Sequence, residues 1–247
     1  MPSRQSPSDK GQSVSEQAGD DRDNLSDIVY QQLKSGLLRA QFKPHQRFKV
    51  RQLALSLGTS ETPVREALMQ LSREGAIEIK PRFYIRVRRL SLAEYKEIRA
   101  MRLVLEPLAA EHALTNISDE TIAKLETIHR ELSEAERTGD WPAALQINSD
   151  FHFALYKQSG MAHLIDVLES LWIRVGPLAS EQYPSAKPTY PGRHQHENIL
   201  AALKARDSYA LRLAVQLDLI EGGTALIKHL QEYEQNNHVD ADTEIGH

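Results

Sequence analysis

The stretch SETPVREALMQLSREG, residues 60–75, reads as a short helix with a turn on each side. Thr62 is a good N-cap residue, and Pro63 after it suits a first helical position, where a missing N–H breaks no hydrogen bond. Gly75 stands where a helix ends. The apolar residues share one face, which leaves a cation near the helix start on the other face. The apolar face holds Val64, Ala67, Leu68 and Leu71, and the outward face holds Arg65, Met69, Gln70 and Arg73.

Two helical patterns precede this stretch and a hairpin pattern follows it. Asn24 suits the cap of a helix whose apolar residues follow helical spacing up to Leu37, and VRQLALSLG predicts a short helix closed by Gly58. The runs AIEIK and FYIRVRR favour two short strands around Pro81 and Arg82. This order of helices, turn and hairpin is the outline of a winged helix-turn-helix.

The charge of the chain is divided unevenly. The net charge is −4 over 247 residues, but residues 43–89 hold 11 lysines and arginines against four glutamates, a balance of +7, which leaves −11 elsewhere. A basic small module beside an acidic remainder indicates that the module meets a polyanion such as DNA.

Composition sets the class of protein. Cysteine is absent, which excludes disulfides and thiolate metal sites and is typical of a reducing cytoplasm. No apolar run approaches the roughly 18 residues of a membrane span, and the N-terminus has no apolar leader, so we expect a cytoplasmic protein without a membrane partner. Residues 1–22 have almost no apolar content, which predicts a disordered tail.

After Ser91 the sequence contains only helical patterns, enough for six or more helices. We therefore predict a mainly α protein, in which an all-α helical bundle follows the winged helix-turn-helix. The expected boundaries are 1–22 for the tail, 23–90 for the DNA-binding domain, 91–235 for the helical domain, which the resemblance described below makes an effector-binding and dimerisation domain, and 236–247 for a loose end.

A recognition helix reads the major groove with its first turns, where Arg65 stands ready for a guanine or a phosphate. Other residues at the helix starts and in the wing supply further contacts. The predicted DNA-binding set is Arg51, Glu61, Thr62, Pro63, Arg65 and Arg82.

Three helical patterns in the acidic part carry polar residues inside apolar stripes, where they are costly unless bonded or liganded. Asn148 and His152 are one turn apart on the first, His196 lies on the second, and Asp218 on the third. Two imidazoles, a carboxylate and an amide suit Zn²⁺, Ni²⁺ or Mn²⁺. A hydrogen-bonded polar core without metal is the alternative.

Residues 48–82, FKVRQLALSLGTSETPVREALMQLSREGAIEIKPR, resemble the DNA-binding domain of GntR-type transcriptional regulators. RLVLEPLAAEHA, NSDFHFAL and HENILAALKARD resemble the helical FCD effector domain of that family's FadR branch. The resemblance implies a homodimer on a palindromic double-stranded operator, controlled by a small metabolite, often a carboxylate. It also implies arginines near the effector pocket, for which Arg102 and Arg174 are the candidates.

This chain departs from the family pattern at several positions. Glu61 stands where an arginine is usual, so it would accept from cytosine N4 and repel phosphate. The wing lacks the usual glycine. Asn148 replaces a usual aspartate, and Asp218 a usual histidine.

Two other functions compete with a ligand-responsive regulator. A metal-dependent enzyme would use His152, His196 and Asp218, but the chain has no H-E-x-x-H motif, nucleophile elbow or phosphate loop. We therefore expect no enzyme. An architectural DNA binder would leave the large acidic domain without a role.

Overall fold

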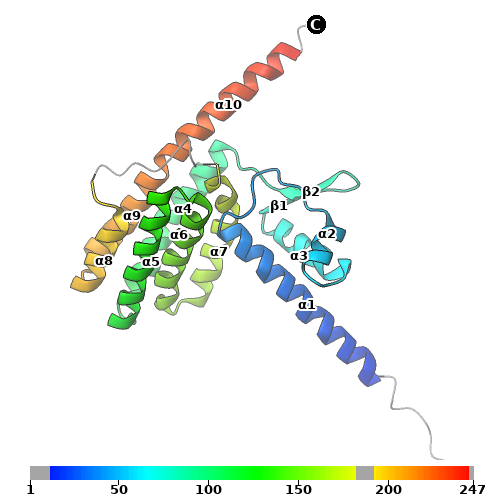
Figure 1. The fold of residues 1–247 in the computed structure, drawn as a ribbon, viewed down its shortest axis with the longest axis horizontal. Helices are drawn as coiled ribbons and strands as arrows, with labels where there is room; N and C mark the ends of the chain where they lie inside the picture. Colours follow the sequence, from blue (N-terminus) through cyan, green and yellow to red (C-terminus); the bar gives the residue numbers. More distant parts are fainter. Residues whose placement is uncertain (1–11, 182–191, 245–247) are drawn as a thin grey trace, which may run out of the picture. The chain divides into compact units, whose positions relative to one another are not determined.

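The computed structural model describes residues 12–181 and 192–244 of the chain (Figure 1). The chain forms two compact units, one of Met1–Ser35 with Arg47–Arg86 and one of Gly36–Gln46 with Val87–His247. We call them the N-terminal unit and the helical unit. The predicted fold class is confirmed, because the first unit carries a helix-turn-helix with a two-stranded wing and the second contains helices throughout its described part.

The N-terminal unit is built around the apolar faces of its helices. Val29 and Leu33 of the first helix are buried, and so are Val64 and Leu68 of the third. Its elements are α1 (Gln12–Leu38, whose last turn belongs to the helical unit), α2 (Val50–Ser56), α3 (Glu61–Arg73), β1 (Ile77–Lys80) and β2 (Tyr84–Val87).

Helix α3 begins two residues earlier than its sequence indicated. Ser60, in extended conformation, is the N-cap, and Glu61 is the first helical residue. The assignment of Thr62 as cap was therefore wrong. Pro63 still breaks no hydrogen bond at the third position, because the first four N–H groups of a helix have no partner within it. Gly75 adopts a left-handed conformation with φ 80°, as the helix stop required.

The turn of the wing is made without glycine. The Phe83 N–H donates to the Lys80 carbonyl at 3.0 Å, with Pro81 in the second position of the turn. Arg82 takes a φ of 66°, a conformation unusual for a residue with a side chain. The exposed Arg82 therefore occupies the tip where a glycine was missing.

Both ends of the chain are more helical than the sequence indicated. Helix α1 begins at Gln12, not at Asn24, and α10 continues to Glu244 beyond the expected end at 235. Residues 1–11 and 245–247 of the predicted tails lie outside the described part. Residues Gly36–Gln46 also group with the helical unit, although the predicted boundary at 90 assigned them to the DNA-binding domain.

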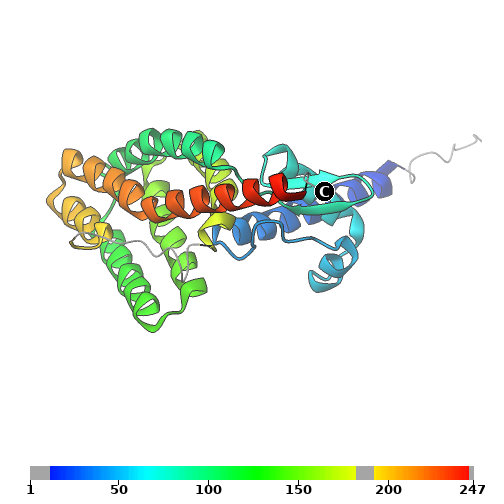
Figure 2. The same cartoon turned by 90° about the horizontal axis from the view of Figure 1, so that it is seen from above.

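The helical unit packs its helices side by side, with α4 against α7 and α9, α5 against α6, and α8 against α9. Figure 2 shows the same arrangement from above. The last helical stretch, residues 208–244, is divided into two helices at Gly223. The elements are α4 (Leu92–Ala113), α5 (Asp119–Thr138), α6 (Trp141–Tyr156), the 3₁₀ turn η1 (Lys157–Ser159), α7 (Ala162–Ala179), α8 (Gln195–Ala205), α9 (Ser208–Gly222) and α10 (Thr224–Glu244).

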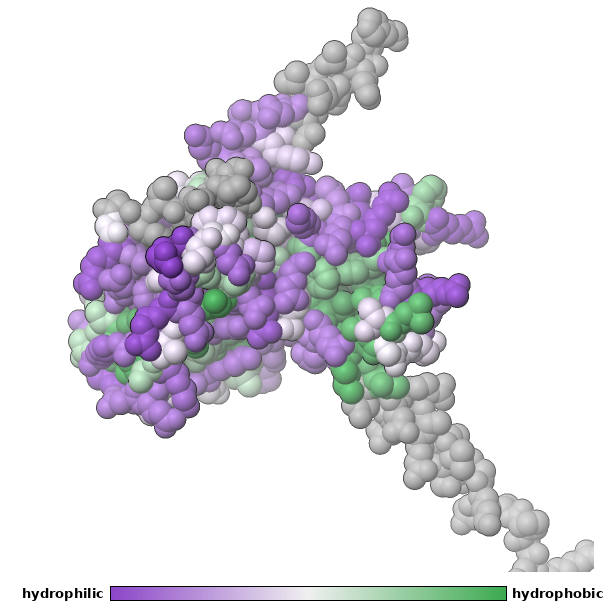
Figure 3. Space-filling view, in the orientation of Figure 1, coloured by the Kyte–Doolittle hydropathy of each residue, from purple (hydrophilic) through white to green (hydrophobic). Residues whose placement is uncertain are grey.

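Side chains of all the helices from α4 to α9 meet in one large apolar core, which includes Phe151, Leu168, Ile199 and Val215. The face of the helical unit seen in Figure 3 is mostly hydrophilic. This division is the pattern of amphipathic helices that turn their apolar stripes inward. The polar residues on those stripes are therefore carried into the interior of the unit.

Candidate functional site

The predicted DNA-binding residues are mostly exposed. Arg51 is the second residue of α2. Thr62 and Arg65 lie in the first turns of α3, and Arg82 is at the tip of the wing. Pro63, by contrast, is buried, so it supports the start of α3 and presents no surface to DNA.

Glu61 engages the arginine that the sequence singled out. A guanidinium nitrogen of Arg65 lies 2.9 Å from a carboxylate oxygen of Glu61, one turn earlier on α3. Both side chains are about half exposed, and ion pairs in such places contribute little to stability. The contact can therefore open when a nucleic acid offers Arg65 a better partner.

In the helical unit, three of the predicted metal ligands meet. His152 on α6, His196 on α8 and Asp218 on α9 bring one ligand atom each to within 4.8 Å of one another. The Nε2 atoms of the two histidines are 3.2 Å apart, and His152 Nε2 lies 3.2 Å from Asp218 Oδ2. His196 Nε2 is 3.9 Å from Asp218 Oδ1.

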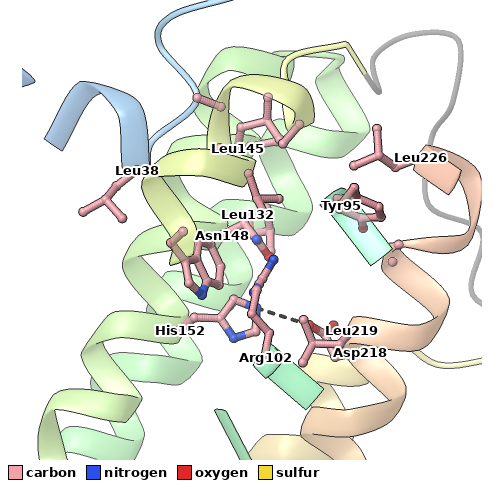
Figure 4. A pocket seen from close by; sticks show the side chains of 18 of the residues that line it. Leu38, Tyr95, Arg102, Leu132, Leu145, Asn148, His152, Asp218, Leu219 and Leu226 are labelled. Atoms are coloured by element: carbon pink, nitrogen blue, oxygen red, sulfur yellow. Dashed lines mark ion pairs between the residues drawn. The ribbon is translucent and has the colours of Figure 1, made fainter. Parts of the chain in front are cut away.

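These spacings fit the ligand shell of a metal ion. Ligand atoms at 2.0–2.2 Å from a shared tetrahedral ion lie about 3.3 Å apart. The three residues are at least nine-tenths buried, so most of their surface is withdrawn from bulk solvent. His152 and Asp218 point toward each other in the cavity of Figure 4, and Asn148 lies one turn before His152 on the same wall.

A hydrogen-bonded chain orients His152. The Tyr156 hydroxyl donates to Glu106 at 2.8 Å, so its oxygen is left to accept from His152 Nδ1 at 3.1 Å. The proton of a neutral His152 is therefore on Nδ1, and its lone pair on Nε2 faces the Asp218 carboxylate. A lone pair and a carboxylate repel each other, so a metal ion or a second proton on the ring would stabilise this contact. Within the protein, the lone pair can accept from His196 Nε2, which lies 3.2 Å away.

Arg102 lines the same cavity and is held by its neighbours. Its guanidinium pairs with the fully buried Glu106 and lies 4.3 Å from the centre of the Trp172 ring. Burial alone would lower the pKa of Arg102, but the Glu106 charge and hydrogen bond raise it. Arg102 therefore remains a cation at the cavity wall. Arg174 is half-buried and is not among the residues that line this cavity.

The cavity has about 120 Å³ of open space, several times what one water molecule needs. Glu136 from α5 also lines it, and burial together with the Asp218 charge raises the pKa of this carboxyl. Leu38 at the end of α1 closes part of the wall. The cavity thus combines apolar walls with one cation and a cluster of metal-ligating groups.

Sequence reasoning missed several of these residues. Glu106 is one of them: besides its pair with Arg102, it accepts hydrogen bonds from Tyr156 and Trp172. His129 and His194 are two others: His129 is buried, and both lie near His196. The spacing of His129 from Ile122, Leu125 and Leu132 was an available indication, because it places the histidine on the apolar stripe of α5.

We expect the free energy of unfolding to fall as the pH drops from 7 toward 4. Burial lowers the pKa of His194 to about 4, and burial also lowers the pKa of His129 and, further, that of His196. Unfolded histidines titrate near 6.5, so below that pH the unfolded chain takes up protons that the folded chain excludes. The loss should reach roughly 1.4 kcal/mol per pH unit for His194 between its unfolded and folded pKa values, and the other two histidines act in the same direction.

Chemical denaturation at pH 7.5, 6 and 5 measures this dependence. His194→Gln should reduce its slope, because that variant removes one of the protons taken up on unfolding. A free energy of unfolding that does not change over this range would contradict the expectation.

No described helix has the length and apolar character to cross a membrane.

Two protein families match the chain. The family described as "Bacterial regulatory proteins, gntR family" matches residues 25–87, and "FCD domain" matches residues 97–220. The HTH-type transcriptional regulator McbR of Escherichia coli (strain K12) is 33% identical over 186 residues, which are 74% of this chain and 84% of McbR. A solved structure of E. coli McbR/YncC has a TM-score of 0.77 at 30% identity, and the match covers 83% of this chain and 98% of that one. A second solved structure, from Rhodococcus sp. RHA1, shares the fold. Its TM-score is 0.67 at 17% identity, and the match covers 82% of this chain and 97% of that one.

Proposed function

The chain belongs to the GntR family of bacterial regulatory proteins and carries an FCD domain. From this we propose that it is a homodimeric regulator whose affinity for a palindromic operator depends on a small carboxylate metabolite. The family and the relatives are transcriptional regulators, so the chain is a transcriptional regulator and not an enzyme. The enzymatic alternative for His152, His196 and Asp218 is thereby excluded. The cytoplasm, where a bacterial operator lies, is the proposed place of action.

On the operator, α3 enters the major groove with Arg65 and Thr62 toward the duplex. Arg51 and Arg82 contact phosphates, as exposed cations near helix starts and wing tips do. Glu61 holds Arg65 in the free protein and then accepts from a cytosine N4 when Arg65 turns to a base. This exchange makes the preferred half-site differ from that of relatives with an arginine in place of Glu61.

Arg65→Ala should weaken binding to the cognate operator by roughly 1–3 kcal/mol, because it removes a forked donor from the start of the recognition helix. The operator is first selected from random duplexes, and affinity is then measured by mobility shift at fixed salt. Arg65→Lys keeps the charge and loses the fork, so it should retain binding to random DNA and lose selectivity. Unchanged affinity of Arg65→Ala for the operator would remove Arg65 from the interface.

The observation that carries the effector proposal is the convergence of Arg102, His152 and Asp218 on one cavity, with His196 Nε2 lying 3.2 Å from His152 Nε2. Arginine is a natural partner for a carboxylate, and a metal ion with an open position also binds one. Two positive centres in one small cavity select a compact anion. We assign Arg174 no part in this site, because it does not line the cavity.

A divalent metal fits the residues of the cavity. His152, His196 and Asp218 would hold it, with Asn148 as a fourth, neutral ligand on the same wall. Zn²⁺, Ni²⁺ and Mn²⁺ accept this mixture of imidazole and oxygen donors. When bound, the ion supplies positive charge and open coordination positions to an anionic ligand. Tyr156 and Glu106 keep the lone pair of His152 turned toward the ion.

His152→Ala should lower the Zn²⁺ affinity of the chain at least 10-fold, because even partners behind the ligands of a metal site change affinity by about 10–100-fold. Competition with a coloured chelator, on protein without an affinity tag, measures this. His163→Gln is the matched control, since His163 is exposed and belongs to neither histidine cluster. Equal affinity in the wild type and His152→Ala would sink the proposed site.

The backbone of α1 connects the cavity with the DNA-binding unit. Leu38 and Ala40 line the cavity, and Leu38 ends α1, the helix whose earlier turns belong to the N-terminal unit. A ligand that shifts the end of α1 would change the freedom or spacing of the two DNA-binding modules in the dimer. Its effect on operator affinity equals its differential affinity for the two arrangements.

A thermal-shift screen of small carboxylates and sugar acids, with and without Zn²⁺, tests the proposal as a whole. An acid that raises the melting temperature, changes operator affinity and loses both effects in Arg102→Lys supports it. Acids that stabilise the protein without changing operator affinity would contradict control by this site.

A further inference from the structure

A second group of histidines lies beside the cavity. His129 on α5, His194 at the N-cap of α8 and His196 each bring one nitrogen to within 4.8 Å of the others. The ring centres are 5.1 Å apart for His129 and His194, and 4.5 Å for His194 and His196. Three imidazoles from two separate helices therefore face one small volume.

Two nitrogens of this group have no hydrogen-bond partner. Nδ1 of His129 and Nδ1 of His196 are both buried, and neither is bonded within the described residues. Nε2 of His196 lies toward His152, so Nδ1 is the nitrogen that His196 leaves to the second group. A buried polar nitrogen without a partner is costly, and coordination to an ion would satisfy such a nitrogen.

Burial also prepares the rings to act as ligands. His196 is fully buried and His129 is only 9% exposed, so little water competes for their ring nitrogens. His129 lines a surface depression separate from the cavity that holds His152. The walls of this depression include Glu126, Arg130, Glu197 and Leu200. This depression leads from solvent to His129, whereas His194 and His196 do not line it.

We propose that His129, His194 and His196 form a second transition-metal site, which takes Zn²⁺ in competition with the His152 cluster. A neutral imidazole has one lone pair, so His196 serves one site at a time. Nδ1 of His194 accepts the His196 backbone N–H at 3.1 Å, and metal binding replaces this hydrogen bond. The first site has a carboxylate and is the tighter of the two.

The donor sets also differ in the metals they accept. Three imidazoles and no carboxylate suit Zn²⁺, Cu²⁺ or Ni²⁺, as in zinc sites with three histidines and one open position. Mn²⁺ prefers oxygen donors, which only the cluster with Asp218 supplies. Removing His152 should therefore abolish Mn²⁺ binding but leave a weaker Zn²⁺ site.

The experiment titrates tag-free full-length protein with Zn²⁺ and, separately, Mn²⁺. His152→Ala should still bind one Zn²⁺ per chain, and adding His129→Gln to it should weaken that binding at least 10-fold. His129→Gln alone should leave the tightest Zn²⁺ step within about 3-fold of the wild type, whereas His196→Ala should lose both sites. Adding His163→Gln to His152→Ala is the matched control, and circular dichroism verifies that each variant is folded.

Three results would overturn the second site. In the first, the folded His152→Ala variant binds no Zn²⁺. In the second, adding His129→Gln to His152→Ala leaves its Zn²⁺ affinity unchanged. In the third, adding His163→Gln weakens Zn²⁺ binding as much as adding His129→Gln does. None of them bears on the effector proposal, which fails instead if His152→Ala leaves the tightest step of the wild type unchanged.

Discussion

Glu106→Ala should lower the free energy of unfolding by about 3–5 kcal/mol, the cost of leaving a buried charge without its partner. Glu106 is fully buried and accepts hydrogen bonds from Tyr156, at 2.8 Å, and from Trp172 Nε1, at 2.7 Å, besides its pair with Arg102. Alanine removes the acceptor of all three donors. Because Arg102 is only 7% exposed, solvent cannot replace the lost carboxylate.

Urea denaturation of Glu106→Ala measures the loss. Glu106→Gln keeps an acceptor without the charge, so it should lie between alanine and the wild type. Glu134→Ala is the control for an ion pair in solvent, since Glu134 pairs with Arg137 on the surface of α5 and should change little. If Glu106→Ala were as stable as Glu134→Ala, the buried network would not hold the helical unit together.

Gly176→Ala should cost roughly 1–3 kcal/mol, because the added methyl has no room. A Cβ at this position of α7 would lie 2.1 Å from the Leu37 carbonyl oxygen at the end of α1. That atom belongs to the backbone, so relief requires moving the end of α1. The same close approach is consistent with the grouping of residues 36–46 with the helical unit, because the backbone at Leu37 packs directly onto a glycine of α7.

Gly192→Ala is the matched control for Gly176→Ala, since a Cβ there meets no atom within 4 Å. Denaturation of both variants should show a loss for Gly176 and none for Gly192. Equal stability of the two would mean that α1 moves away from α7 at no cost. If the end of α1 moved so easily, a ligand in the cavity could not shift the DNA-binding modules through Leu38, and the proposed coupling would be weak.

Local sequence patterns predicted the helix-turn-helix, the wing and the helical unit, because each depends on contacts within a few residues. Gly75 ended α3 as expected, since only its own backbone conformation was at stake. The start of α3 was misjudged, because Ser60 and Thr62 are both good caps and their choice depends on how the preceding turn packs. The meeting of His152 with His196 was predicted from polar residues on apolar helix stripes, a pattern that places both side chains in the interior.

The sequence by itself determined which faces of each helix are apolar and which polar residues those faces carry inward, because helical periodicity is a local property. Only the tertiary structure decided which of these polar groups meet. Glu106 binds Tyr156 across 50 residues, and His129 lies beside His194 although they are on different helices. Such pairings depend on how α4 to α9 pack, and one helix alone contains no information about the neighbour that will satisfy its buried polar atoms.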